Sequence, residues 1–120
     1  MKNYNSKQNQ KIRQSLDLLD DSFNHARGVV KLNKNNTFNH ELMKFILCWE
    51  ILQAGEDFVT EAIFKNGKRS DVFNLVQGEA LEVTYSEDLK SIDDKKTEYP
   101  VPVFSFDSKK MSKWLKNYVR

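Results

Sequence analysis

The feature that most restricts the fold of this chain is a change of hydrophobic period near residue 58. Beyond that position three runs alternate apolar and polar side chains: FVTEAIF, RSDVFNLV and EALEVTY. A period of two is typical of strands. Asn66-Gly67 and Gln77-Gly78 stand between the runs and are signals for tight turns. The sequence therefore predicts three antiparallel strands connected by hairpins.

The part of the chain before the strands is expected to contain two helices. Residues 1–10 are polar and lack periodicity, which favours a flexible arm, and residues 11–120 suit a single domain. Apolar residues at steps of three and four predict an amphipathic helix over about residues 11–31; they are Ile12, Leu16, Leu19, Phe23, Ala26 and Val30. A second helix, HELMKFILCWEILQA, is expected between an N-cap at Asn39 and a C′ glycine at Gly55.

The part after the strands predicts helix, strand and helix. Ser86 suits the N-cap of a helix that ends near Tyr99, Pro100 and Pro102 bracket the entry to the strand VPVFSF, and Ser108 suits the N-cap of a last helix. The apolar face of that last helix is expected to contain Met111, Trp114, Leu115 and Tyr118. The predicted order α-α-β-β-β-α-β-α belongs to the α+β class.

Charge and cysteine content limit the function only loosely. The net charge of +2, from 19 basic and 17 acidic residues, is too balanced to indicate a polyanionic partner by itself. The lone Cys48 excludes a disulfide within the chain and is expected to be a buried thiol. The sequence has no apolar run of membrane-spanning length and no leader pattern, so we expect an intracellular, cytoplasmic protein without a membrane partner.

Acidic residues on the second and third strands indicate a site. If Gln77-Gly78 is a two-residue loop, Asp71 lies opposite Thr84, and Asp71, Glu82 and Thr84 share one face of the sheet. Two neighbouring carboxylates repel each other unless a cation or a proton lies between them. We therefore predict a divalent metal site.

A sheet with one wet face explains the same alternation without any site. On position alone the two interpretations are about equal. The apolar neighbours Leu81, Val83 and Val72 indicate central strands, where an acid needs a reason, and they favour the site.

The order of these residues resembles the PD-(D/E)xK nuclease superfamily over about residues 40–106. Glu41 begins the helix before the strands, Asp71 follows the Asn-Gly hairpin, Glu82-Val83-Thr84 replaces the (D/E)xK triplet, and Tyr99 lies on the next predicted helix. The pattern is most similar to archaeal Holliday-junction resolvases and to RecB-type and archaeal-viral nucleases. The resemblance implies a restriction-endonuclease-like α+β fold, with an αβββαβ core, a mixed four-stranded sheet and extra terminal helices.

The resemblance also implies a chemistry. Asp71, Glu82 and the main-chain carbonyl of Val83 are expected to bind Mg²⁺ or Mn²⁺. Glu41 is expected to reach the metal through water or to position the nucleophile. The expected reaction is hydrolysis of a DNA phosphodiester. The resemblance also implies a homodimer that selects its DNA by structure.

Two positions depart from the family pattern. Ser70 replaces the proline before Asp71, and Thr84 replaces the lysine that helps to activate water and to offset phosphate charge. Lys96 is the leading candidate for a substitute cation, and Lys95 and Lys44 are alternatives, although a solvated side chain explains each of them equally simply. DNA-backbone contacts are expected from Lys44, Lys95, Lys109 and Lys113.

The remaining candidates have ordinary interpretations. His40 is expected to be a polar residue of a helix start, and Glu61 to face away from Asp71. Trp49 and Trp114 are expected in the core rather than as base-stacking groups. Three functions stay open: a metal-dependent nuclease, a degenerate nuclease fold that binds nucleic acid or protein without cleavage, and an unrelated α+β interaction module.

Overall fold

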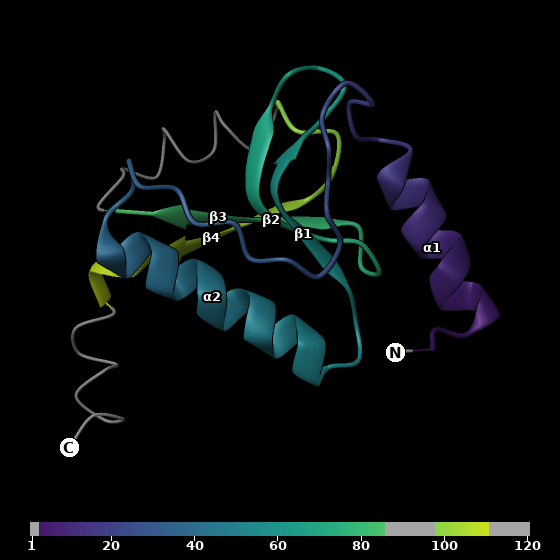
Figure 1. Ribbon diagram of the computed structural model, residues 1–120, viewed down its shortest axis with the longest axis horizontal. Coiled ribbons are helices and arrows are strands. Elements are labelled where there is room, and N and C mark those ends of the chain that lie inside the picture. Colours follow the sequence, from purple (N-terminus) through teal and green to yellow (C-terminus); the bar gives the residue numbers. More distant parts are fainter. Residues whose placement is uncertain (1–2, 86–97, 111–120) are drawn as a thin grey trace.

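The structure is a computed structural model that describes residues 3–85 and 98–110. It has an α+β fold with a four-stranded sheet, shown in Figure 1. Its elements are α1 (Ser6–Leu16), α2 (Phe38–Gln53), β1 (Phe58–Ile63), β2 (Arg69–Asn74), β3 (Glu79–Thr84), β4 (Val103–Asp107) and a 3₁₀ turn, η1 (Ser108–Lys110).

The sheet is mixed and has the strand order β1-β2-β3-β4. The first three strands are antiparallel, whereas β4 runs parallel to β3 from the pair Ala80–Val103 to the pair Thr84–Asp107. The predicted hairpin at Asn66-Gly67 is present, and the Phe64 N–H donates to the carbonyl of Lys68 at 2.8 Å. The predictions of the antiparallel strands and of a mixed sheet are confirmed.

The first helix differs from its prediction at both ends. It begins at Ser6, where Asn5 and Gln8 form a reciprocal capping box, and ends at Leu16, so residues 6–10 are helical and the predicted helix over 11–31 is wrong beyond Leu16. The segment that follows runs along the edge of β1 through the bridges Leu19–Phe64 and Arg27–Val59. Pairing with a strand edge has thus overridden the helical spacing of its apolar residues.

The second helix begins two residues earlier than predicted, at Phe38 instead of His40. The Thr37 side chain, rather than that of Asn39, caps α2 by accepting the N–H of His40 at 3.1 Å. Gly55, with φ of +77°, follows the helix, and its N–H donates to the carbonyl of Leu52. The predicted end of α2 is therefore confirmed.

Two apolar clusters cover the two faces of the sheet. One joins α1 and the residues after it to the sheet through Ile12, Leu19, Phe64 and Phe73. The other joins α2 to the opposite face and includes the buried thiol of Cys48. α2 is not buried all round, because Trp49 is 53% exposed, so the expectation that Trp49 belongs to the core is wrong.

Two predicted helices lie outside the described residues in whole or in large part. These are the helix from Ser86 to near Tyr99 and the last helix after Ser108, with Trp114. Tyr99 itself is described, in an irregular segment before Pro100. Within residues 3–85 and 98–110, no helix has the length and apolarity needed to cross a membrane.

Candidate metal centre

The register between β2 and β3 sets the position of the two predicted acidic ligands. The pairs Asn74–Glu79, Phe73–Ala80 and Val72–Leu81 leave four residues in the connection instead of two. The predicted pairing of Asp71 with Thr84 is therefore wrong, because the register is shifted by two positions. An even shift keeps every side chain on its face, and continuing the same register places Asp71 opposite Glu82.

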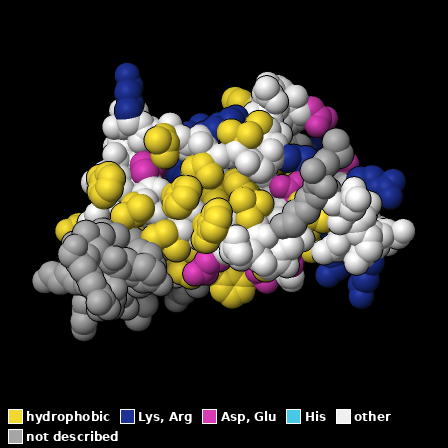
Figure 2. All heavy atoms as spheres, turned by 60° about the horizontal axis from the view of Figure 1, so that its bottom comes forward, with side chains coloured by type: hydrophobic (Ala, Val, Ile, Leu, Met, Phe, Trp, Pro, Cys, Tyr) yellow, Lys and Arg dark blue, Asp and Glu magenta, His cyan; other side chains and the backbone are white. Residues whose placement is uncertain are grey.

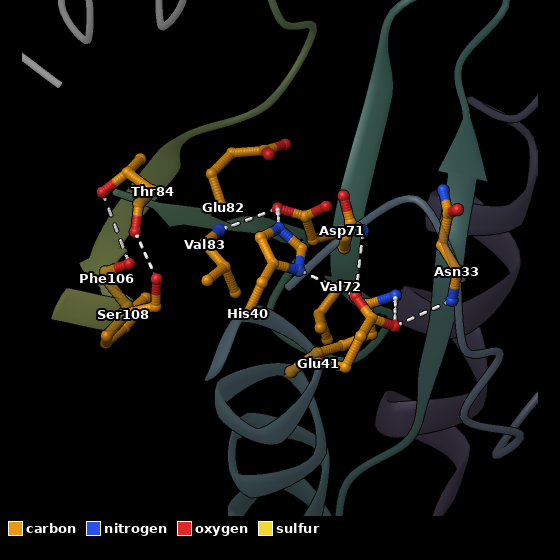
Figure 3. Close-up of polar contacts among 12 residues, drawn as sticks. Asn33, His40, Glu41, Asp71, Val72, Glu82, Val83, Thr84, Phe106 and Ser108 are labelled. Atoms are coloured by element: carbon orange, nitrogen blue, oxygen red, sulfur yellow. Dashed lines mark hydrogen bonds and ion pairs between the residues drawn. The ribbon is translucent and has the colours of Figure 1, made fainter. Parts of the chain in front are cut away.

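The Asp71 carboxylate lies between the two strands rather than outside them. The last β2–β3 pair before it is Val72–Leu81. Beyond that pair, Asp71 Oδ2 accepts the main-chain N–H of Val83 at 2.7 Å, as Figure 3 shows. The N–H and C=O of one strand residue point to the same neighbouring strand, so the Val83 carbonyl, the third predicted ligand, also faces β2.

Glu82 is the acid whose ionisation is most perturbed. Burial, and after it the charge and hydrogen bond of the Asp71 carboxylate, raise the pKa of Glu82 to about 9. The two carboxyl groups therefore interact across the two strands, and their interaction favours the protonated form of Glu82.

Tyr99 connects Glu82 to the main chain of β2. The phenol oxygen lies 2.6 Å from the carbonyl oxygen of Arg69 and 2.8 Å from Glu82 Oε1. A phenol has only one proton, so Tyr99 donates to one of these two oxygens at a time. Burial and the neighbouring Glu82 raise the pKa of Tyr99, which keeps the phenol neutral.

His40 also lies in this cluster, although a polar residue of a helix start was the favoured interpretation of it from the sequence. Its Nδ1 lies 2.8 Å from Glu41 Oε1, and its Nε2 lies 3.5 Å from Asp71 Oδ2. The ring thus has Nδ1 directed at Glu41 and Nε2 directed at Asp71, an orientation also found in metal-ligating histidines whose second nitrogen is held by a carboxylate. The missed signal was the position of His40, directly before Glu41 in the first turn of α2.

Glu41 is an ionised carboxylate that holds His40. It accepts hydrogen bonds from Lys44 Nζ at 2.8 Å, from Asn36 Nδ2 at 2.9 Å and from the N–H of Asn33 at 2.9 Å. Burial opposes its ionisation, but these donors and His40 outweigh burial and lower the pKa of Glu41 to about 2. The His40 ring thus lies between the carboxylates of Glu41 and Asp71 (Figure 3).

Lys44 is not available to a nucleic acid, contrary to expectation. Its side chain is fully buried, and Nζ donates to Glu41, to Glu61 Oε1 at 2.7 Å and to the carbonyl of Lys31 at 3.0 Å. These three acceptors use all three ammonium protons. Burial opposes the charge, but Glu41 and Glu61 raise the pKa of Lys44, so it stays a cation inside the fold.

Thr84, which stands where the PD-(D/E)xK pattern has a lysine, points towards β4. Its hydroxyl lies 3.4 Å from the carbonyl oxygen of Phe106, and its own carbonyl accepts the Ser108 hydroxyl at 2.9 Å. Figure 3 shows it apart from Asp71. Thr84 therefore packs two strands together, and its hydroxyl is already engaged.

Of the other predicted lysines, the structure describes Lys109 alone. Lys95, Lys96 and Lys113 lie outside the described residues. Lys109 is exposed after β4, where its main-chain N–H donates to Asp107. Among residues 3–85 and 98–110, no three His, Cys, Asp or Glu side chains converge ready-made on one ion position.

Comparisons of this chain with protein-family models, with curated proteins and with solved structures find no match. The function is therefore argued from the geometry of Asp71, Glu82, His40 and Glu41.

Proposed function

We propose that this protein is a Mg²⁺- or Mn²⁺-dependent DNA nuclease of the PD-(D/E)xK type with a restriction-endonuclease-like core. The observation that supports the proposal is the burial of Glu82 beside Asp71, opposite it in the continued β2–β3 register, where burial and the Asp71 charge raise the pKa of Glu82 to about 9. A buried acid in this state costs stability at neutral pH. A divalent cation in place of the proton removes that cost.

The donor set fits a hard cation. Mg²⁺ is bound through one or two carboxylates and keeps several waters, and Asp71, Glu82 and the Val83 carbonyl offer oxygen atoms alone. His40 Nε2 adds a nitrogen ligand that Mn²⁺ accepts more readily than Mg²⁺ does. When bound, the ion lowers the pKa of a water and neutralises charge on the scissile phosphate.

The protein side chains position this chemistry. The Val83 N–H fixes one oxygen of Asp71, and Glu41 fixes the ring of His40. Lys44 pairs with both Glu41 and Glu61, so the three side chains together add one negative charge instead of two to the field that faces a phosphate. We assign the contacts with DNA phosphates to Lys95, Lys109 and Lys113, and the substitute cation to Lys96.

A second function is favoured by Thr84. The hydroxyl of Thr84 is directed at the Phe106 carbonyl and has no positive charge. Thr84 therefore cannot activate water or offset phosphate charge as the lysine of the PD-(D/E)xK pattern does. A protein with the same cation site but no cation for the phosphate binds DNA or a protein partner without cleaving DNA. This degenerate nuclease fold is the alternative.

Metal binding and cleavage are tested separately. Calorimetric titration with Mn²⁺ at pH 7.5, in two buffers of different ionisation enthalpy, should show release of about one proton per ion bound, because the ion displaces the proton of Glu82. Glu82→Gln should bind Mn²⁺ weakly and release none. Binding without proton release, or equal binding by the variant, would contradict the site.

DNA cleavage then separates the two functions. A nuclease cleaves with Mn²⁺ or Mg²⁺ and not with EDTA, and Lys96→Ala lowers turnover by roughly 10²- to 10³-fold. If the wild-type protein binds Mn²⁺ but cleaves nothing, and Thr84→Lys creates cleavage, the degenerate fold is correct.

A further inference from the structure

α2 carries a second apolar face that points away from the sheet. Phe38, Leu42, Phe45 and Trp49 follow one another at steps of four, three and four residues. Phe38 is 75% exposed and Phe45 is 49% exposed, while Leu42 is partly buried. In Figure 2 the side of the molecule on which α2 lies is turned towards the viewer, and apolar side chains gather on that side. We call these four residues the α2 seam.

The α2 seam is distinct from the core face of the same helix. Lys44, Leu47, Cys48 and Ile51 point inward and are buried. A helix that is apolar on two sides is expected to be covered on both. The outer side, unlike the inner one, has large aromatic side chains in contact with solvent.

The exposed area of the seam equals that of the largest apolar patch on a typical monomer, which is often functional. Taking roughly 200 Å² for a phenylalanine and 240 Å² for a tryptophan, its three aromatic side chains expose about 350–400 Å². Contiguous apolar patches of this size mark interaction sites. The seam is therefore a candidate interface.

We propose that the α2 seam binds the same seam of a second copy of this chain, forming a dimer with two-fold symmetry. Two copies would bury about 700–800 Å² from the aromatic side chains alone, and Leu42 with the bordering Ile46 brings the total near the ~1,000 Å² of a specific interface. Alternating steps of three and four are the spacing by which two helices interlock.

The charge on α2 favours a second copy over a charged partner. No seam residue is charged and the bordering Asn39, Ile46 and Gln53 are neutral, whereas Glu41 is held within the fold by Lys44 and the exposed Glu50 lies at the outer edge of this border. An uncharged face meets its own copy without repulsion, as an isologous interface requires. It offers no cation to DNA phosphates or to an acidic peptide.

The test is the oligomeric state of the full chain in EDTA without DNA, so it is independent of the proposed nuclease function. Sedimentation velocity between about 1 and 100 µM should show a monomer–dimer equilibrium. Phe45→Glu and Trp49→Glu should each weaken dimerisation by at least about 30-fold, as expected for a central aromatic residue. Their circular dichroism should match the wild-type spectrum.

Phe23→Glu is the matched control. Phe23 is also 49% exposed but lies in the segment between α1 and α2, so its substitution should leave the dimer intact. A wild-type protein that is monomeric at 100 µM overturns the proposal. Dimers that survive both seam substitutions, or that Phe23→Glu dissociates equally, overturn it as well. Association that continues beyond the dimer shows an open interface and also overturns it.

Discussion

Replacing Glu82 with glutamine should remove most of the pH dependence of stability that this site creates. Glutamine has the shape of the protonated acid and no titrating group. In the folded wild-type protein the pKa of Glu82 is raised to about 9, whereas in the unfolded chain it is that of an ordinary, solvent-exposed glutamate. Between these two values the folded state holds a proton that the unfolded state has lost.

The sign and size of the effect follow from this proton. The free energy of unfolding falls by about 1.4 kcal/mol per pH unit wherever the folded state binds one proton more. From pH 6 to pH 8 the limit is about 2.7 kcal/mol, and water that reaches the pair after local relaxation reduces it, so we expect a loss of about 1–2 kcal/mol. Stability is full below the unfolded pKa and is lost as the pH rises towards the folded one.

Urea unfolding in EDTA at pH 6, 7 and 8 measures this loss. The wild-type protein should weaken relative to Glu82→Gln across the series, while Glu79→Gln, a substitution on the same strand, should follow the wild type. Mn²⁺ should restore the wild-type protein more at pH 8 than at pH 6, because less proton competes with the ion. Parallel curves for wild type and Glu82→Gln would refute the buried, protonated acid.

Three further substitutions test the surrounding contacts. Lys44→Met should destabilise the protein by about 3–5 kcal/mol in urea unfolding, because it leaves Glu41 and Glu61 without their cation; the exposed Lys11→Met is its control and should change little. Asp71→Ala should cost about 1–3 kcal/mol because the Val83 N–H loses its acceptor, and Asp71→Asn should recover most of this while both variants lose Mn²⁺-induced thermal stabilisation; equal stability of the two would contradict the role of that hydrogen bond. Tyr99→Phe should lower the thermal midpoint through loss of the bond to the Arg69 carbonyl, and an unchanged midpoint would show that this bond contributes nothing net.

The strands were predictable because their signals are local. Period-two alternation and the Asn66-Gly67 turn located β1, β2 and β3 within a residue or two of their bounds. The closeness of Asp71 and Glu82 also followed from the sequence, although the loop length was wrong, because face depends on parity and the register error was even.

The N-terminal half was less predictable because contacts between residues distant in the sequence, rather than local patterns, determine its structure. Phe23, Ala26 and Val30 have helical spacing, but their segment is held along β1 by contacts such as that of His25 Nε2 with the N–H of Ile63. The role of His40 was hidden for the same reason. No local pattern shows that the start of α2 meets the end of the β2–β3 ladder.

The hydrogen bond between Asp71 and the Val83 N–H places Asp71 and Glu82 under different selection. Asp71 closes the sheet where the β2–β3 ladder stops, so selection for folding alone retains it, even in a lineage that has abandoned catalysis. Glu82 destabilises the cation-free fold as the pH rises, so a lineage that does not use the proposed cation would replace it with glutamine or an apolar residue. If the proposed cation site is correct, the residue at position 82, rather than the one at 71, distinguishes relatives of this chain that use a cation.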